Sequence, residues 1–125
     1  MKVILDTNFL LVPGTLGVDV FTKIREFDPR AELFVVDKTI AELEKIQAEQ
    51  KKFRAAAALA VQLLKQQDVK VIKTEKNKST DLIIAETAEK NKYAVATQDK
   101  MLKGLLKSKN IPTIILRQKK YIRLE

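Results

Sequence analysis

The chain has 125 residues, 46% of them hydrophobic, and no apolar run approaches the roughly 20 residues that a membrane-spanning helix needs. It contains no cysteine and no histidine, which excludes disulfides, zinc–thiolate sites, thiol nucleophiles and imidazole catalysis. We therefore expect a single domain, residues 1-125, located in the cytoplasm. Its chemistry, if any, must use carboxylates, hydroxyls, amides and amines.

Charge is distributed unevenly along the chain. The net charge is −3 over residues 1–44 and +11 over residues 45–125, which gives the total of +8. Such a surplus favours a polyanionic partner such as nucleic acid, although a lysine-rich surface is also typical of a protein that is merely soluble. Aromatic residues make up only 6% of the chain, too few for a base-stacking platform.

The first half of the chain predicts strands alternating with helices. Val3–Leu5 is a short apolar run, as expected for a strand buried on both faces of a parallel sheet. The elements expected after it are a Pro-Gly turn at 12–15 that can cover a substrate, a helix at 16–27 ended by Asp28-Pro29, a strand at 33–36, and a helix that opens with a capping box from Thr39 to Glu42.

The second half continues the same alternation. Its expected elements are an Ala-rich helix at 51–67, a strand at 69–72, a helix capped by Thr80, a strand at 93–97, a helix at 100–109 with Met101, Leu102, Leu105 and Leu106 buried, a strand at 113–116 and an edge strand at 121–124. Alternating helices and buried strands predict an α/β fold with a mostly parallel sheet that has helices on both faces.

Two groups of basic residues are candidates for binding nucleic acid. Lys51, Lys52 and Arg54 crowd the expected start of a helix, where positive charge opposes the helix dipole, so we look for a function that favours them. Lys100, Lys103 and Lys107 share one face of a later helix. The alternative for this second group is a solvated helix face.

Four acidic residues are placed to converge at one edge of the sheet. Asp6 and Asp99 each follow a buried strand, whereas Glu42 and Asp81 each lie in the first turn of an expected helix. Carboxylates that meet in a low dielectric repel one another, and a divalent cation removes the conflict. Oxygen ligands suit Mg²⁺ or Mn²⁺, which can activate water for attack on a phosphodiester.

Each acid also has a local explanation. Glu42 can complete the capping box, Asp81 can face the helix dipole, and Asp99 can begin a helix. Thr97 can be a strand former and nothing more. Asp6 has no such local explanation. No single acid is specific for a metal site, and the prediction rests on the ordered set of four.

Over nearly its full length the chain resembles the PIN-domain family of metal-dependent nucleases. The matching segments are Val3-Ile-Leu-Asp-Thr-Asn8, Thr39-Ile-Ala-Glu-Leu-Glu-Lys-Ile46, Ser79-Thr-Asp-Leu-Ile-Ile-Ala85 and Ala96-Thr-Gln-Asp-Lys-Met-Leu102. The segments 5–13 and 18–21 and the ending 111–117 resemble the archaeal branch, close to ribosomal-RNA-processing nucleases and often grouped with VapC-type toxins of toxin–antitoxin systems.

The resemblance implies a three-layer α/β/α fold and cleavage of single-stranded RNA with Mg²⁺ or Mn²⁺. It implies a metal site built from Asp6, Glu42, Asp81 and Asp99. In the nuclease hypothesis, we expect Asp6 and Asp99 to be direct ligands, Asp81 a ligand directly or through water, and Glu42 a ligand or the group that orients the attacking water. Asn8 and Thr97 match supporting polar positions. A homodimer, and an antitoxin or a ribosome-biogenesis partner, are implied as well.

Two other functions compete with the nuclease hypothesis. One is a non-catalytic RNA-binding or assembly module of ribosome biogenesis, whose acids hold a structural ion or none. The other is a phospho-acceptor signalling domain, which needs paired acids after the first strand, whereas here Asp6 alone follows it.

Overall fold

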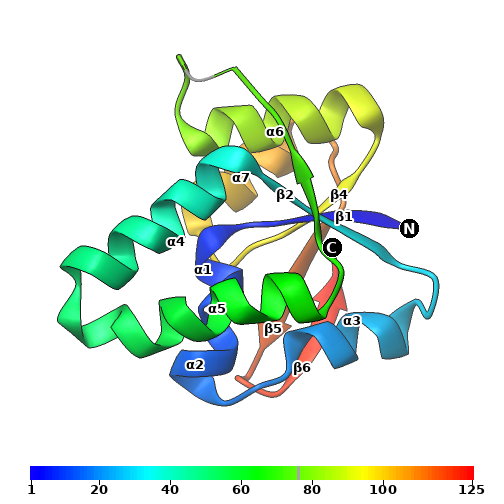
Figure 1. Ribbon diagram of the computed structural model, residues 1–125. Helices are drawn as coiled ribbons and strands as arrows, with labels where there is room; N and C mark the ends of the chain where they lie inside the picture. Colours follow the sequence, from blue (N-terminus) through cyan, green and yellow to red (C-terminus); the bar gives the residue numbers. More distant parts are fainter. Residues whose placement is uncertain (76) are drawn as a thin grey trace.

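The computed structural model describes residues 1–75 and 77–125, in which a central sheet is covered by helices on both faces (Figure 1). The strands are β1 (Lys2–Leu5), β2 (Glu32–Val36), β3 (Lys70–Ile72), β4 (Ala94–Ala96), β5 (Thr113–Arg117) and β6 (Tyr121–Leu124). The helices are α1 (Thr7–Leu10), α2 (Val12–Leu16), α3 (Val20–Phe27), α4 (Asp37–Glu49), the 3₁₀ turn η1 (Lys51–Phe53), α5 (Arg54–Gln66), α6 (Thr80–Asn91) and α7 (Lys100–Ser108).

The strand order is β3-β2-β1-β4-β5-β6, and β1 to β5 run parallel while β6 is antiparallel to β5. The chain therefore builds the sheet outward from β1 in one direction, through β2 and β3, and then returns to the other side of β1 with β4. The strand order thus reverses between β1 and β4. In open α/β sheets, ligand sites form outside the carboxyl ends of the strands at this point.

Alternate strand residues divide the core into two layers. Val3 and Leu5 pack with α1, α2, α3 and α5 on one face, whereas Ile4 packs with α6 and α7 on the other. The two helix layers lie below and above the sheet in Figure 1. Because strands buried on both faces need apolar residues at every position, the short apolar runs of the sequence were sufficient to locate them. The predicted three-layer α/β/α fold is confirmed.

The segment predicted as a Pro-Gly turn is helical. Pro13 lies in the first turn of α2, where its missing N–H is harmless, and the helix ends at Gly17 with a left-handed φ of 68°. Gly14 faces α5 closely, since a Cβ at this position would lie 2.5 Å from the Cα of Ala56. The predicted helix at 16–27 correspondingly begins later, at Val20.

Three further local predictions were wrong. The helix α4 begins at Asp37, two residues before the predicted capping box, and no side chain caps it. Ser79, not Thr80, caps α6 by accepting a hydrogen bond from the Leu82 N–H. Met101 is 83% exposed, because Leu102 and Leu106 mark the buried line of α7 and the preceding residue points about 100° away from it.

Both edges of the sheet are short. The outer strand β3 has three residues, begins with Lys70 and leaves Val71 half exposed. On the opposite edge β6 has four residues and carries Arg123 between Ile122 and Leu124. Among the described residues, no helix is long and apolar enough to span a membrane.

Candidate active site

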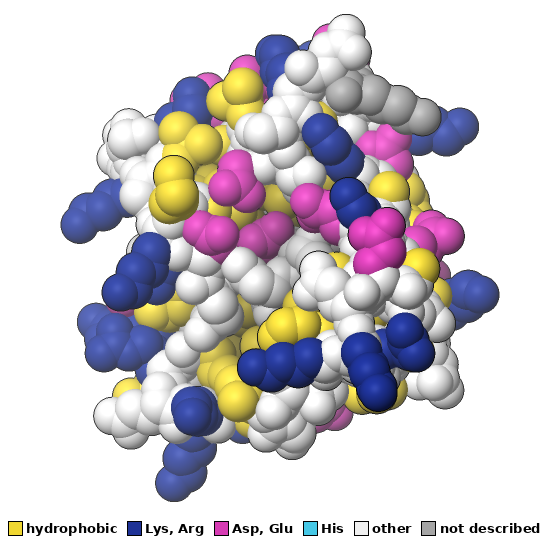
Figure 2. Space-filling model, turned by 90° about the vertical axis from the view of Figure 1, so that its left-hand side faces the viewer, with side chains coloured by type: hydrophobic (Ala, Val, Ile, Leu, Met, Phe, Trp, Pro, Cys, Tyr) yellow, Lys and Arg dark blue, Asp and Glu magenta, His cyan; other side chains and the backbone are white. Residues whose placement is uncertain are grey.

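The four predicted acids line one pocket at the carboxyl edge of the sheet, where the strand order reverses. This acidic pocket has a volume of about 430 Å³. It is lined by Asp6, Thr7, Asn8, Leu11, Glu42, Lys45, Ile46, Gln50, Asp81 and Asp99. Figure 2 views the side of the molecule toward which β1 runs, and acidic side chains gather near its middle, beside a hollow, with Lys and Arg side chains around them.

Asp6 lies at the end of β1 and is only 5% exposed. Burial raises the pKa of its carboxyl to about 6, and repulsion from Asp81 and Glu42 adds to the effect, while hydrogen bonds from Thr97 and from the Thr7 backbone oppose it. The Thr97 hydroxyl donates to Asp6 Oδ2 over 2.8 Å. Because β1 and β4 are neighbours, this bond joins two strand ends that are 91 residues apart.

Thr97 also positions a second acid, because its hydroxyl oxygen accepts the backbone N–H of Asp99 over 3.0 Å. Asp99 Oδ1 then accepts the backbone N–H groups of Met101 (2.8 Å) and Leu102 (3.1 Å), which caps α7. The local explanation of Asp99 is therefore correct, yet the same carboxylate lines the acidic pocket. One residue serves both purposes.

Glu42 is held by two hydroxyls from distant elements. Thr7 of α1 donates to Glu42 Oε1 over 2.6 Å, and Thr80 of α6 donates to Oε2 over 3.0 Å. The capping-box explanation fails, since Glu42 lies in the second turn of α4 and contacts other helices instead. Both of its oxygens are fixed toward the junction of α1, α4 and α6.

Asp81 completes the set from the first turn of α6. Partial burial raises the pKa of its carboxyl, and the charges of Asp99 and Glu42 raise it further. Together with the causes of the raised pKa at Asp6, this couples all four acids electrostatically. A site that disfavours its own ionisation in this way is one that a bound cation stabilises.

The supporting residues lie beside the acids. Asn8 Oδ1 accepts the Gln98 N–H over 3.0 Å and lies 3.3 Å from the Thr97 hydroxyl. The Gln98 side chain in turn pairs with the backbone of Leu116, accepting its N–H over 2.7 Å. These bonds fix the segment that leads from β4 to Asp99.

The acidic pocket also contains residues that sequence reasoning missed. Thr7 and Thr80 contact Glu42 across 35 and 38 residues of sequence, which no local pattern reveals. Lys45, Ile46 and Gln50 extend the pocket along α4. The spacing of Lys45 and Ile46 from Glu42 was a usable signal, because residues three and four positions apart share one face of a helix, whereas Gln50 follows the end of α4.

The chemistry of the pocket fits a hard divalent cation. Its charged ligands are carboxylate oxygens, with hydroxyl and amide oxygens beside them, which are the donors that Mg²⁺ and Mn²⁺ prefer. In the present side-chain positions, no three acids within residues 1–75 and 77–125 stand close enough together to hold a metal ion. The acids are thus gathered in one pocket without being closed around one point.

The two predicted basic groups have different surroundings. Lys103 and Lys107 line a groove of about 880 Å³ together with Arg123 of β6 and with Glu125, which pairs with Arg123 over 3.9 Å, and we call this the basic groove. Lys100 is exposed at the start of α7, next to Asp99.

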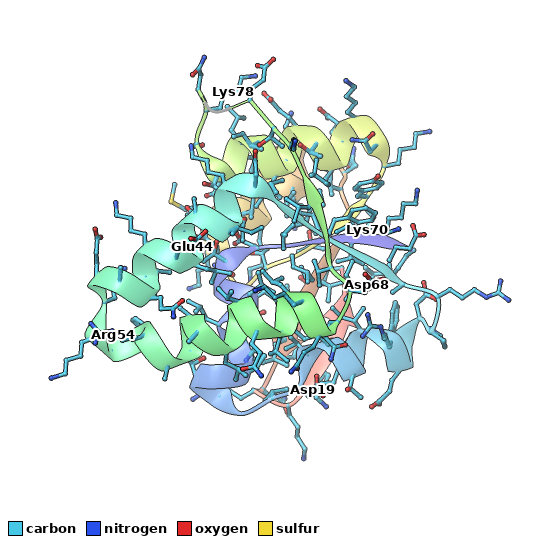
Figure 3. All side chains as sticks on the ribbon, in the orientation of Figure 1. Asp19, Glu44, Arg54, Asp68, Lys70 and Lys78 are labelled. Atoms are coloured by element: carbon cyan, nitrogen blue, oxygen red, sulfur yellow. The ribbon has the colours of Figure 1, made fainter. Side chains whose placement is uncertain are left out.

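Lys51, Lys52 and Arg54 lie at the junction between α4 and α5. There they follow the carboxyl end of α4, where positive charge is favourable, and the Arg54 Nε donates to the Gln47 carbonyl over 3.1 Å. These charges thus lie both at the start of α5, as predicted, and just after the carboxyl end of α4, which offsets the unfavourable dipole interaction. Figure 3 shows Arg54 and Glu44 on the side where the parallel strands end, and Lys70 on the opposite side.

Known proteins share this fold and sequence over nearly the whole chain. Residues 3–119 match the family described as "PIN like domain". Ribonuclease VapC4 of Methanocaldococcus jannaschii is 29% identical over 98% of this chain and 95% of its own length. Ribonuclease VapC9 of Archaeoglobus fulgidus is 32% identical over 98% of this chain and 87% of its own length.

A solved structure agrees with these relatives. The PIN domain endonuclease Utp24 superimposes with a TM-score of 0.82 and 27% identity, covering 99% of this chain and 90% of that one. From the family match and the shared fold, we conclude that the chain belongs to the PIN-like domain family.

Proposed function

We propose that this protein is a divalent-metal-dependent endoribonuclease that cleaves phosphodiester bonds of single-stranded RNA. The observation that carries the proposal is the acidic pocket, in which Asp6, Glu42, Asp81 and Asp99 converge from four different elements. The ribonuclease names of the two curated relatives and the endonuclease name of the solved structure support the same activity.

Each acid has a role that follows from its surroundings. Asp6, Asp81 and Asp99 present oxygens that would hold Mg²⁺ or Mn²⁺, and Glu42 either joins them or orients the attacking water. The bound ion supplies Lewis acidity, which lowers the pKa of a coordinated water and offsets charge on the phosphodiester. Thr97 orients Asp6, and Thr7 and Thr80 hold Glu42, so both carboxylates are oriented before substrate arrives.

The basic residues of α7 would contact the RNA backbone along a path that leads away from the acids. Lys100 begins α7 beside Asp99, and Lys103 and Lys107 line the basic groove, which lies toward the amino end of β5. The junction residues Lys51, Lys52 and Arg54 follow Gln50, which itself lines the acidic pocket. Phosphate contacts of this kind position a strand without reading its sequence.

A labelled, structured RNA with single-stranded loops tests the proposal. The wild type is incubated with Mn²⁺ or with a chelator beside Asp6→Asn, which keeps the shape of the side chain but removes its charge. Asp68→Asn is a matched control, because Asp68 is exposed on the opposite side of the molecule and has a left-handed φ that Asn tolerates (Figure 3). We expect cutting by the wild type and Asp68→Asn in Mn²⁺ only, and none by Asp6→Asn.

The net charge of +8 favours a second candidate, a non-catalytic RNA-binding module whose acids hold a structural ion or none. If wild type and Asp6→Asn bind RNA equally and neither cuts it, this second candidate replaces the first. Wild-type cutting by Asp6→Asn would instead remove Asp6 from the mechanism.

The cellular role and the partners stay predictions. The toxin of a toxin–antitoxin pair and a ribosomal-RNA-processing nuclease both fit an endoribonuclease of this family. Induced expression that arrests growth, with Asp6→Asn harmless, supports the toxin role, whereas altered ribosomal RNA ends without arrest support processing. Sedimentation of the purified protein tests the predicted homodimer.

A further inference from the structure

The acidic pocket has a second half that contains no acid. Lys45, Ile46 and Gln50 of the α4 region line it, and Leu11 lines it from the junction between α1 and α2. Carboxylates that hold an ion account for the first half only. The second half requires its own explanation.

The residues of this second half follow an order along α4. Lys45 and Ile46 lie three and four positions after Glu42, on one face of α4, and Gln50 follows the last residue of this helix with an extended backbone. At a rise of 1.5 Å per residue, Ile46 lies about 6 Å along the helix axis from Glu42, and Gln50 lies beyond the end of the helix. Beside the acids the pocket thus offers an ammonium group, an apolar surface and an amide.

We propose that Leu11, Lys45, Ile46 and Gln50 form a subsite for one nucleotide next to the cleaved bond of the RNA. The inference rests on the proposed function and adds to it a position at which the base is read. The Lys45 ammonium contacts the phosphate of this nucleotide, Leu11 and Ile46 contact the face of its base, and the Gln50 amide binds the edge of the base.

Lys45 and Gln50 have free side chains to offer. Lys45 is exposed, and no ion pair within the described residues engages it. The backbone of Gln50 is fixed, because its N–H donates to the Ile46 carbonyl over 2.9 Å and its carbonyl accepts the Phe53 N–H over 3.1 Å. Its side-chain amide forms no hydrogen bond with the part of the chain that the structure describes.

The apolar surface explains why the amide should dominate base selection. Leu11 and Ile46 are half-buried and pack against the core, so their positions are stable while part of each side chain faces the pocket. Neither is aromatic, so the base gains apolar contact without ring stacking. An amide offers one donor and one acceptor side by side, which distinguishes base edges that present different partners.

The test is the sequence profile of cleavage in a randomised single-stranded RNA, read by sequencing the products formed in Mn²⁺. At one position flanking the cut, we expect the wild type to prefer some bases and Gln50→Ala to reduce the ratio of best to worst base about fivefold or more. Gln47→Ala is the matched control, because Gln47 is an exposed glutamine three residues before Gln50, near the end of α4, and does not line the pocket. It should keep the wild-type profile.

Lys45 is tested by salt dependence. Lys45→Ala should weaken binding evenly across sequences and reduce the slope of log affinity against log salt by about 0.7, the value for one phosphate contact on a single strand. Lys65→Ala, which removes an exposed lysine from the last turn of α5, should change neither quantity.

A binding measurement separates failure of the subsite from failure of the nuclease proposal. The affinities of hexanucleotides of A, C or U are measured in chelator for two proteins, the Asp6→Asn variant and the double variant that also carries Gln50→Ala. If the wild type cuts RNA but its profile is even, or is unchanged by Gln50→Ala, the subsite is overturned and the nuclease stands. If nothing is cut, the nuclease proposal fails, and the subsite survives only if Gln50→Ala abolishes a base preference in binding.

Discussion

The Thr97 hydroxyl joins Asp6 to Asp99, donating to the Asp6 carboxylate over 2.8 Å and accepting the Asp99 N–H over 3.0 Å. A single hydroxyl at the end of β4 thereby fixes two of the four acids. Because it stabilises the ionised form of Asp6, it also opposes the burial that raises the pKa of this carboxyl to about 6.

Thr97→Val removes this hydroxyl while keeping the shape of the side chain. The pKa of Asp6 should rise further, so protons compete better with the metal, and the Mn²⁺ concentration for half-maximal cleavage should rise about tenfold at pH 6 and less at pH 8. Thr113→Val, at another buried threonine whose hydroxyl donates to a backbone carbonyl, is the control. An equal change at both pH values would assign Thr97 a purely structural role.

Asp6→Asn should make the metal-free protein more stable at neutral pH. Folding raises the pKa of the Asp6 carboxyl from 3.8 to about 6, so the folded protein is more stable when this carboxyl is protonated. Its stabilising contribution to the free energy of unfolding is fully present below about pH 4 and is lost as the pH rises through 6. The loss is about 3 kcal/mol, from a shift of about two units. In urea unfolding with chelator, the free energy of unfolding of Asp6→Asn should increase relative to that of the wild type between pH 4 and 7. A difference between the two proteins that does not change with pH would contradict the raised pKa of Asp6.

Thr7→Val and Thr80→Val each remove one of the two hydroxyls that hold Glu42. Groups that hydrogen-bond to a metal-binding side chain typically contribute 10- to 100-fold to metal affinity or activity. We therefore expect each variant to cut RNA at least about tenfold more slowly. Thr15→Val, which removes an exposed hydroxyl bonded to the Leu11 carbonyl, should retain the wild-type rate. Unfolding curves that match the wild type are needed to separate lost orientation from lost fold.

Neutralising the basic groove should change binding and not chemistry. Lys103→Gln and Lys107→Gln should each reduce the salt slope of RNA affinity by about 0.7, while single-turnover cleavage at saturating protein stays within twofold. Lys65→Gln serves as the control, because Lys65 lies on a different helix outside the groove. An unchanged slope in both groove variants would leave these lysines as solvated surface.

Gly14→Ala and Gly104→Ala should change stability in opposite directions. A Cβ on Gly14 would lie 2.5 Å from the Ala56 Cα, and forcing α2 away from α5 should cost about 1–3 kcal/mol. Nothing lies within 4 Å of a Cβ on Gly104, inside α7, so alanine there should add about 0.5–1 kcal/mol. The urea midpoint of unfolding measures the stability of both variants. If Gly14→Ala has the midpoint of the wild type, α2 can move away from α5 without loss of stability.

The sequence predicted the sheet better than it predicted the ends of helices. Val3–Leu5 and the other buried runs identify strands because both faces of this sheet are covered, which demands apolar residues at successive positions. Helix starts depend on tertiary contacts. Thr39 begins a plausible capping box, yet α4 starts at Asp37, and Glu42 is engaged by Thr7 and Thr80 of other helices.

The four acids could be found from sequence, but what holds them could not. Asp6 and Asp99 follow strands and Asp81 opens a helix, which are local patterns that a single sequence displays, whereas Glu42 was found through a capping box that the structure does not form. The hydroxyl partners come from residues that lie 35, 38 and 91 positions away, and only the folded chain brings them together. Lys45 was readable from helical spacing once α4 was known to continue past Glu42, whereas Gln50 lies just beyond the end of this helix.

The short edges of the sheet bear on how copies of this chain can associate. Intermolecular strand pairing needs a long, flat, unpaired edge, and both outer strands here are brief and carry Lys70 or Arg123. Sheet extension is therefore disfavoured at both edges, which also limits aggregation by that route. A homodimer of this protein would form through its helix surfaces, leaving the central sheet confined to one molecule.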